Sequence, residues 1–329
     1  AYPGLIPQSG RVLEHIFHGD RRTASRNHTG RLAPATTTAT TTKRSFGHPR
    51  RGDPPSKRGG NLSHEKLLAV VQNTQKLGFR AVSLVKAEPI RAMGRLEHEA
   101  AAVDPDTGIV YLTEDKHHSL FYRYIPKVPG ELIKGGRLQA LAIAGQPSMR
   151  THNWSKVPDL VAGQSLPVSW IDLKNVDRED DDLREHGAKD GAATFARGEG
   201  LCAADGYFAF TCTIGGRARL GQVFAYEPSP FEGTSRESTA PGQLRLIAES
   251  DSKSLLRNAD NLTAAPWGGL VVCEDTSSHC GLVAVAEDGS QYAIADNAYS
   301  KSELAGVCFS PDGKTLFVNI QYPGTTLAI

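Results

Sequence analysis

The sequence of 329 residues has no apolar run long enough to cross a membrane, and it lacks the basic, apolar and small-residue pattern of an export signal. Arg21 and Arg22 form a twin-arginine pair, but polar residues follow them where an export signal would be apolar. The sequence starts at Ala1 without a methionine and ends on a strand-like segment, which is consistent with a fragment or a processed form. The missing signal therefore does not decide the cellular compartment.

The motifs of several large enzyme classes are also missing. The sequence has no P-loop, no glycine fingerprint of dinucleotide binding and no Gly-x-Ser-x-Gly nucleophile elbow. Cysteine is scarce and never forms a C-x-x-C pair, so no zinc site is indicated. Four cysteines lie in apolar strand patterns, where free buried thiols are common, and a bridge between Cys273 and Cys280 is the less favoured alternative. The five cysteines are Cys202, Cys212, Cys273, Cys280 and Cys308.

Charge is distributed unevenly along the chain, although the net charge is only +1. Residues 1–60 contain eleven Lys and Arg against three acidic residues, whereas the rest of the chain contains 26 basic and 33 acidic residues. A basic segment suits phosphates, nucleic acid or anionic lipid, and an acidic body suits cations. Because residues 1–62 are polar and low in complexity, we expect them to be disordered and solvated, with no specific nucleic-acid partner.

One pattern occurs four times in the C-terminal three-quarters of the chain. An acidic residue is followed by apolar residues, a turn with Asp-Gly, Thr-Gly or Gly-Gly, and a second apolar run that ends in polar or acidic residues. Each copy is typical of a β-hairpin. The four copies begin at Glu99, Glu199, Asp260 and Glu303.

Hairpins that must stack to bury their apolar faces, and that recur at irregular spacing, indicate the blades of a β-propeller. We therefore predict an all-β protein in which residues 88–329 form the propeller region. Further strands are expected at 119–126 and 135–143, and the charged stretch 171–191 is expected to be an insertion between blades. A helix and a lead-in strand are expected over residues 63–87.

The acidic residues that open and close the repeats are candidate metal ligands. The equivalent ends of all blades face one central channel, so carboxylates from different repeats would meet there and repel one another. A hard cation such as Ca²⁺ removes this repulsion and accepts many oxygen ligands in irregular geometry. The alternative is that each acid caps a turn or pairs with a nearby Arg or Lys. The candidates are Glu99, Glu114, Glu199, Asp260, Glu274, Asp275 and Glu303.

Two further charged features each have two interpretations. Arg197 lies two residues before Glu199, so on a strand both side chains would face the same side. Such a pair suits a catalytic site where an arginine fork and metal ions hold the same phosphate, and the alternative is a plain ion pair. The acidic run 177–182 could bind calcium, but it lacks the ligand spacing of an EF-hand, and a solvated loop is favoured.

Taken together in this order, these segments resemble the PhoX-type alkaline phosphatases. The resemblance covers residues 88–329 and includes HEAAAVDPDTGIVYLTED, FARGEG, GGRARLGQVFAYEP, DNLTAAPWGGLVVCED and ELAGVCFSPDGKTLFVNIQ. It implies an exported, six-bladed propeller whose channel holds iron and calcium ions and hydrolyses phosphomonoesters. It also implies that Glu99 and Glu199 are metal ligands, that the other acidic candidates are further channel positions, and that Arg197 clamps the phosphate.

The sequence departs from the family pattern in its N-terminal third. The family supplies an iron-ligating cysteine from an Asn-Cys-Ala-Gly-Gly-like segment, which has no counterpart in residues 1–87, and the N-terminal blades are not recognisable there. The smaller change to Arg197-Gly198-Glu199-Gly200, where the family has Arg-Pro-Glu-Gly, keeps the functional pair. The iron site, and with it full activity, is therefore in question.

Three functions are compatible with this sequence. The first is a metal-dependent phosphomonoester hydrolase that uses Ca²⁺ and Fe³⁺, acts on a small phosphomonoester, and is a monomer located in the periplasm or secreted. The second is a non-catalytic, calcium-binding propeller remnant, which the missing cysteine favours. The third is a calcium-dependent lactonase-like propeller hydrolase, which FSPDGKTLFVN and the Asp260-Asn261 pair would also suit. Iron content, and turnover of a phosphomonoester compared with a lactone, would distinguish the three.

Overall fold

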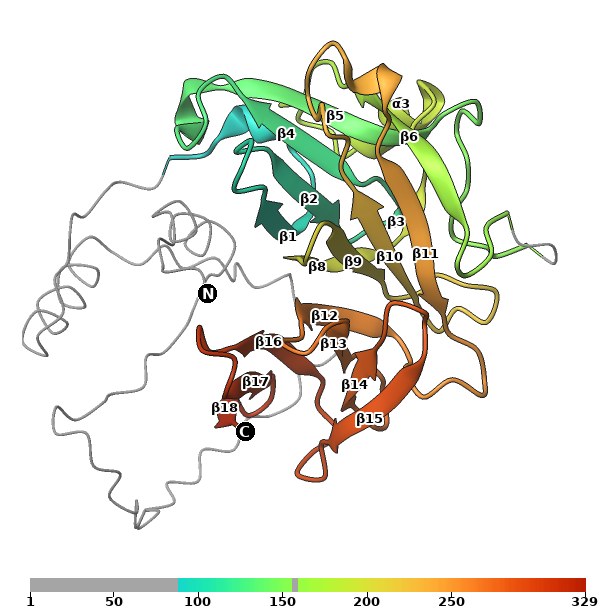
Figure 1. Ribbon diagram of the computed structural model, residues 1–329, viewed down its shortest axis with the longest axis vertical. Helices are drawn as coiled ribbons and strands as arrows, with labels where there is room; N and C mark the ends of the chain where they lie inside the picture. The colour runs from blue at the N-terminus through green and yellow to red at the C-terminus, as the bar shows by residue number, and fades with distance from the viewer. Residues whose placement is uncertain (1–87, 156–158) are drawn as a thin grey trace, which may run out of the picture. The chain divides into compact units, whose positions relative to one another are not determined.

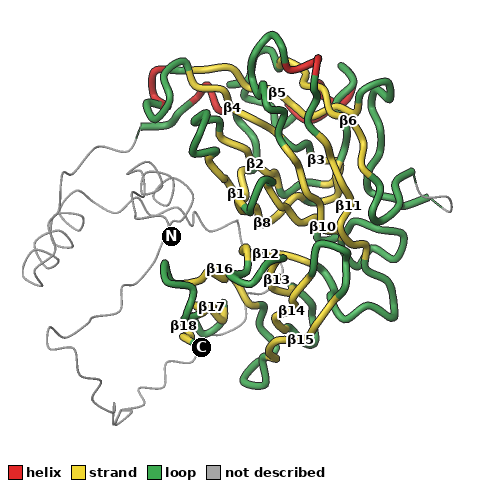
Figure 2. Tube along the Cα trace, in the orientation of Figure 1, coloured by secondary structure: helices red, strands yellow, loops and turns green. Residues whose placement is uncertain are grey.

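The computed structural model describes residues 88–155 and 159–329. The disorder expected for residues 1–62, and the helix and strand expected over 63–87, lie outside these described residues. From Ile90 onward the described residues belong to one compact unit. Strands and loops make up most of this unit, with only short helical segments (Figure 2). Within the described residues, no helix is both long enough and apolar enough to cross a membrane.

The largest sheet contains nine antiparallel strands in the order β1-β2-β4-β5-β6-β11-β10-β9-β8. Its two end strands, β1 and β8, contact each other, so the sheet is nearly closed into a barrel (Figure 1). The strands are β1 (His98–Val103), β2 (Val110–Glu114), β4 (Tyr122–Pro126), β5 (Gly136–Ile143), β6 (Ser165–Asp172), β8 (Gly198–Ala203), β9 (Phe208–Cys212), β10 (Gln222–Glu227) and β11 (Gln243–Glu249).

Three smaller sheets and four short helical segments complete the described unit. One sheet contains β12 (Ala259–Ala264), β13 (Leu270–Glu274), β14 (Gly281–Val285) and β15 (Gln291–Asp296). Another contains β16 (Leu304–Phe309), β17 (Leu316–Ile320) and β18 (Thr325–Ala328), and the last pairs β3 (His117–Ser119) with β7 (Phe195–Ala196). The helical segments are α3 (Leu183–Lys189) and the 3₁₀ turns Arg91–Met93, Leu132–Lys134 and Glu237–Thr239.

The four hairpins expected from the sequence are present as β1–β2, β8–β9, β12–β13 and β16–β17. The strand expected at 135–143 is β5, and the one expected at 119–126 is divided between β3 and β4. The first strands of the hairpins lie next to one another, because β8 contacts both β1 and β12, and β12 contacts β16 (Figure 1). The chain therefore brings the beginnings of four separate hairpins to one place.

The mostly β class is confirmed, but the described residues do not show the predicted propeller, which is six-bladed in the family and was expected to be incomplete in this chain. The first two hairpins belong to one nearly closed sheet instead of two separate blades. Strand β6 causes this, because it pairs with both β5 and β11 and so joins the outer strands of the two groups. Only the third and fourth hairpins have sheets of their own within the described part of the chain.

The core of the nine-stranded sheet is aromatic. All five residues of β2 and of β9 are buried. The rings of Phe121 and Phe210 stack with centroids 4.3 Å apart, and Phe210 stacks in turn on Phe224. Each fully buried side chain of this size contributes roughly 1.5–3 kcal/mol to stability, so this core holds the strands that carry the acidic residues. The described cysteines, including Cys273 and Cys280, are all free.

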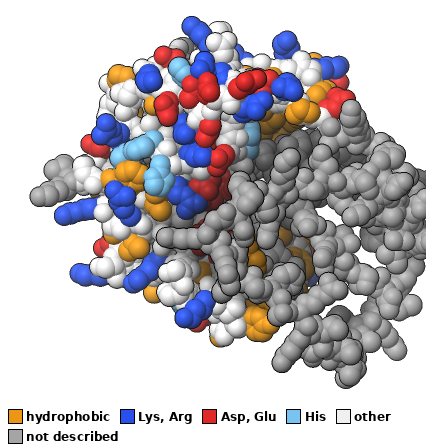
Figure 3. All heavy atoms as spheres, turned by 180° about the vertical axis from the view of Figure 1, so that it is seen from behind, with side chains coloured by type: hydrophobic (Ala, Val, Ile, Leu, Met, Phe, Trp, Pro, Cys, Tyr) orange, Lys and Arg blue, Asp and Glu red, His pale blue; other side chains and the backbone are white. Residues whose placement is uncertain are grey.

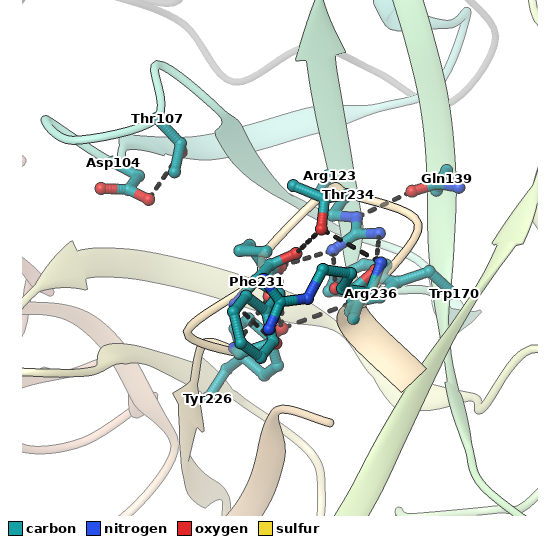
Figure 4. A network of polar contacts seen from close by, with 12 residues as sticks. Asp104, Thr107, Arg123, Gln139, Trp170, Tyr226, Phe231, Thr234 and Arg236 are labelled. Atoms are coloured by element: carbon teal, nitrogen blue, oxygen red, sulfur yellow. Dashed lines mark hydrogen bonds and ion pairs between the residues drawn. The ribbon is translucent and has the colours of Figure 1, made fainter. Parts of the chain in front are cut away.

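A buried polar network attaches the loop between β10 and β11 to the neighbouring strands (Figure 4). At its centre lies Arg123 on β4, whose side chain is 1% exposed. Its Nε donates to Gln139 at 2.8 Å, its Nη1 donates to Glu232 at 2.5 Å, and its Nη2 donates to Glu237 at 2.8 Å. The guanidinium also lies 4.2 Å from the ring centroid of Trp170. The loop is thus fixed by one buried cation that contacts β5, β6 and two carboxylates.

We expect Arg123→Met to lower the free energy of unfolding by about 3–5 kcal/mol, because it leaves Glu232 buried without its cation. Denaturant unfolding of the two proteins measures the difference. The matched control is Arg137→Met, which removes an exposed ion pair with Asp172 and should cost less than about 1 kcal/mol. Equal effects of the two substitutions would show that the network does not stabilise the fold.

The charged stretch 171–191 begins in β6 and continues beyond it, and several of its acids pair with basic side chains. Asp177 accepts from Arg91 at 2.8 Å, Asp182 accepts from Arg178 at 2.8 Å, and Asp181 lies 2.7 Å from Arg184. These pairs favour the loop interpretation over a calcium site. The short helix α3 at the end of this stretch was not expected from the sequence.

Candidate metal centre

The first strands of three hairpins share a β-bulge at the same place. The pairing register shifts between residues 98 and 101 in β1, between 198 and 201 in β8, and between 259 and 262 in β12. A bulge inserts one extra residue and redirects the side chains beside it, and such bulges are common next to active sites. The acidic residues within these bulges are Glu99, Glu199 and Asp260.

The fourth hairpin differs from the other three. Its bulge lies between residues 305 and 308 of β16 and contains Gly306, at a φ of +62°, where the other repeats have an acid. Glu303 precedes the strand, and its carbonyl oxygen accepts from the backbone N–H of Gln321. The carbonyl of Arg197 accepts from Thr213 in the same way. Glu303 therefore occupies the position in its hairpin that Arg197 occupies in the second hairpin. The equivalence of hairpin positions expected from the sequence holds for Glu99, Glu199 and Asp260 but not for Glu303.

Three carboxylates from the third and fourth hairpins meet at one point. Asp260, Asp275 and Glu303 each offer a ligand oxygen, and these oxygens lie within 4.8 Å of one another. Asp260 comes from the bulge of β12, Asp275 directly follows β13, and Glu303 directly precedes β16. All three side chains are half-buried. We call these three residues the acidic triad.

The carboxylates of the triad lie close enough to repel one another. Burial, together with the charges of Glu303, Asp275 and Glu99, raises the pKa of Asp260 to about 7. Burial and the neighbouring carboxyl of Asp275 raise the pKa of Glu303 to about 7. No salt bridge from a described Lys or Arg neutralises the triad directly. A bound divalent cation would supply that charge, and a set of carboxylate oxygens is the donor set that Ca²⁺ prefers.

A second group of charged residues is centred on Arg197, which lies between β7 and β8 at a φ of +55°. Its Nε and Nη2 donate to the two oxygens of Asp115 at 2.6 and 2.8 Å, in a two-point contact. Nη2 also donates to Glu199 at 2.9 Å. No hydrogen bond joins Nη1 to the described residues, so this nitrogen can contact a ligand. Sequence reasoning did not select Asp115, although it follows Glu114 as Asp275 follows Glu274.

The two groups of charges act on each other electrostatically. Burial raises the pKa of Glu199 to about 10, and the charges of Asp260, Asp115 and Glu99 add to this while Arg197 opposes it. The pKa of Glu99 is also raised, first by loss of hydration and then by the charge of Asp115. Glu199 is 6% exposed. The carboxylates of four hairpins therefore form one electrostatic unit with a single arginine inside it.

Two of the predicted ligands have partners of their own. Glu114 is fully buried, accepts from the hydroxyl of Tyr122 at 2.6 Å, and has a pKa raised to about 7 chiefly by burial. Glu274 accepts from the backbone N–H groups of Arg257 and Gly281 at 2.7 and 2.9 Å. Neither belongs to the acidic triad. Side chains at adjacent strand positions point to opposite faces, so Asp115 and Asp275 lie on the opposite face from Glu114 and Glu274.

The comparison with family models decides the classification. The chain matches the model of alkaline phosphatase PhoX over residues 43–324. It belongs to the PhoX family. The resemblance expected from the sequence is thus confirmed, and the match begins before residue 88, where that resemblance was expected to start. No curated protein matched the chain.

Membership in the PhoX family implies an alkaline phosphatase-type phosphomonoesterase that depends on metal ions. The acidic triad is a group in the described chain that could hold such an ion. No cysteine belongs to it, and all of its donors are carboxylate oxygens. The donor set of the triad therefore fits Ca²⁺, whereas iron stays a prediction for this PhoX protein.

Proposed function

We propose that this PhoX protein hydrolyses small phosphomonoesters at the site formed by the acidic triad and Arg197. Asp260, Asp275 and Glu303 would hold Ca²⁺, with Glu99 and Glu199 as further ligands. The observation that carries the proposal is the convergence of carboxylates from four hairpins around one arginine. Burial and neighbouring carboxylates raise the pKa values of Glu199, Asp260 and Glu303, and a bound cation would stabilise their charged forms.

The arrangement of the hairpins supports a propeller with this site in its channel. The first strands β1, β8, β12 and β16 lie side by side and each has an acidic residue within or just before it. In a propeller, the innermost strand of each blade lines the central channel. We propose that the described residues supply four such innermost strands.

The proposal includes export of the protein, to the periplasm or the medium, and a monomeric state.

Arg197 would bind the phosphate group of the substrate. Its contact with both oxygens of Asp115 fixes the plane of the guanidinium, and its Nη1, which makes no hydrogen bond to the described residues, would donate to the phosphate. A bound cation would neutralise the phosphate oxygens, which carry negative charge throughout phosphoryl transfer. The contribution of Arg197 is to position the phosphate beside the carboxylates of the site. Asp115 is a positioning residue, since it acts through Arg197.

The test of this function is turnover of p-nitrophenyl phosphate by the purified chain, supplied with Ca²⁺ alone and with Ca²⁺ plus Fe³⁺. We expect phosphomonoester hydrolysis and no hydrolysis of a lactone under the same conditions. Hydrolysis of the lactone alone would identify a lactonase-like enzyme. Calcium binding without turnover of either substrate would identify a non-catalytic cation-binding protein, and both of these results would contradict the proposal.

A pH dependence of stability follows from the raised pKa values. Asp260 and Glu303 bind protons more tightly in the folded chain than in the unfolded chain, where such carboxyls titrate near pH 4. The contribution of these two groups to the stability of the metal-free protein should therefore be lost as the pH rises from about 4 to about 7. We expect Tm to fall by about 5 °C or more between these values, and added CaCl₂ to remove the decrease. A metal-free protein that is more stable at pH 8 than at pH 5 would contradict the crowding of the carboxylates.

A further inference from the structure

A group of histidine, tryptophan and arginine side chains lies beside the residues just described. Histidine side chains gather next to acidic and basic ones on the face shown in Figure 3. Its central member is His152, in the turn after β5, which is 6% exposed. The ring of His152 stacks on Trp154 with centroids 4.2 Å apart, and the ring of His118 lies edge-on to it at 5.4 Å. The guanidinium of Arg219 covers Trp154 at 4.5 Å.

The backbone holds this group next to Arg197. The strand that contains His117 and His118 pairs with Phe195–Ala196, and the N–H of Arg197 donates to the carbonyl of Lys116. The turn that contains His152 is fixed to the loop between β9 and β10, because the N–H of Gly216 donates to the carbonyl of His152 and Trp154 Nε1 donates to the carbonyl of Ile214. Backbone hydrogen bonds therefore hold the segment that contains His118 against the segment that contains Arg197.

One ring nitrogen of His152 has an unmet hydrogen bond. Its Nδ1 accepts from the backbone N–H of Trp154 at 3.4 Å. Its Nε2 is buried and has no partner among the described residues. Because Nδ1 accepts, the neutral ring carries its proton on Nε2, which is then a donor without an acceptor. Burying a donor without an acceptor is unfavourable, so the position favours a ligand with an oxygen acceptor.

The charges around His152 indicate the sign of that ligand. Burial lowers the pKa of His152 to about 4, and the charges of His118, Arg150 and Arg219 lower it further while Asp159 opposes them. His118, Arg150 and Arg219 are exposed, so the group is open to solvent on one side. Two arginines, Arg150 and Arg219, thus act on His152 against one carboxylate, Asp159, and the missing acceptor fits an oxyanion better than a neutral carbonyl.

We propose that His152, together with Arg150, Arg219 and His118, forms an oxyanion subsite that binds a second acidic group of the substrate. The inference rests on the proposed phosphomonoesterase function and adds the substrate class, which is phosphomonoesters that carry a carboxylate or a further phosphate. Arg197 would take the phosphate that is hydrolysed, and the subsite would take the other anionic group. Free inorganic phosphate has the same chemistry and can bind at the same place.

Two substrates that differ only in the second acidic group test the subsite. 3-Phosphoglycerate has a carboxylate where glycerol 3-phosphate has a hydroxymethyl group. We expect the protein to prefer 3-phosphoglycerate in kcat/KM, and His152→Phe to lower this preference about tenfold, because the phenyl ring keeps the stack on Trp154 but has no donor. His152→Gln should restore most of the preference, since its amide supplies both an acceptor and a donor. The matched control is His279→Phe, which removes an exposed histidine paired with Asp296 on β15 and should leave the preference unchanged.

Direct binding of inorganic phosphate provides a readout that does not depend on turnover. Titration with phosphate should change the fluorescence of Trp154, and Trp154→Phe should abolish the change. His152→Phe and the exposed variant Arg219→Gln should each weaken this binding about tenfold. Arg219→Gln gives the answer if His152→Phe fails to fold. A chain that binds phosphate in this way but hydrolyses no ester would remove the proposed function and keep the oxyanion subsite.

The two sources of the oxyanion give different results. Loss of the preference for 3-phosphoglycerate in His152→Phe identifies the substrate carboxylate as the ligand. If His152→Phe relieves inhibition by inorganic phosphate but leaves the preference for 3-phosphoglycerate unchanged, the ligand of the subsite is free phosphate. This result would overturn the assignment of a substrate class. If His152→Phe and Arg219→Gln change neither the preference nor the affinity for phosphate, the subsite does not exist.

Discussion

Asp260→Asn should abolish calcium binding at the acidic triad and lower kcat/KM for p-nitrophenyl phosphate by more than about 100-fold. The triad has three ligand oxygens within 4.8 Å, and the substitution replaces a charged ligand by a neutral amide of the same shape. Loss of a group that only supports a metal ligand already costs about 10–100-fold, so loss of a ligand should cost more. Calorimetric titration with Ca²⁺ and steady-state kinetics on the same sample measure both effects.

The matched control for this substitution is Asp296→Asn. Asp296 is an exposed carboxylate at the end of β15 that pairs with His279, outside the triad. Calcium affinity and turnover of this control should equal those of the unaltered protein. If Asp260→Asn binds calcium with unchanged stoichiometry and affinity, the triad is not a calcium site, whatever the effect on turnover.

Arg197→Lys should raise KM for phosphomonoesters by roughly 10–100-fold and leave calcium affinity nearly unchanged. Lysine keeps the positive charge beside Glu199 but cannot make the two-point contact with Asp115, so the phosphate contact is no longer held in place. The loss corresponds to one or two charge-assisted hydrogen bonds. Kinetics at several substrate concentrations, together with a calcium titration, separate the two roles.

The control for the arginine is Arg178→Lys, which replaces a two-point contact with Asp182 in the charged stretch 171–191. It should leave both KM and calcium affinity unchanged. If Arg197→Lys lowers calcium affinity and KM stays the same, Arg197 supports the carboxylates instead of binding the substrate.

The hairpins could be predicted from the sequence because their signals are local. Apolar runs on both sides of a Gly-containing turn fix a hairpin within about twenty residues, and the turn glycines Gly108, Gly206 and Gly313 do adopt positive φ angles. The nine-stranded sheet could not be predicted in this way. It depends on β6, which connects two groups of strands that are distant in the sequence, and no local pattern specifies this pairing.

Part of the candidate site could be predicted because its signal is also local. The acidic residue at the start of each hairpin is visible in the sequence, but the bulges that contain Glu99, Glu199 and Asp260 are not. The bulge of β16 is shifted along the strand, so Glu303 lies before the strand instead of within its bulge. The contact between Asp115 and Arg197 joins two hairpins and has no local signal. The separation of Glu114 from Asp115, and of Glu274 from Asp275, follows from strand alternation and could have been predicted.

The most direct test of the account is the metal content of the purified chain, with turnover of p-nitrophenyl phosphate measured on the same sample before chelation, after chelation and after calcium is restored. We predict bound calcium, loss of turnover on chelation, and recovery of turnover when Ca²⁺ is added back. Turnover that continues in a sample shown to contain no metal would contradict the account, because the acidic triad would then have no role in hydrolysis.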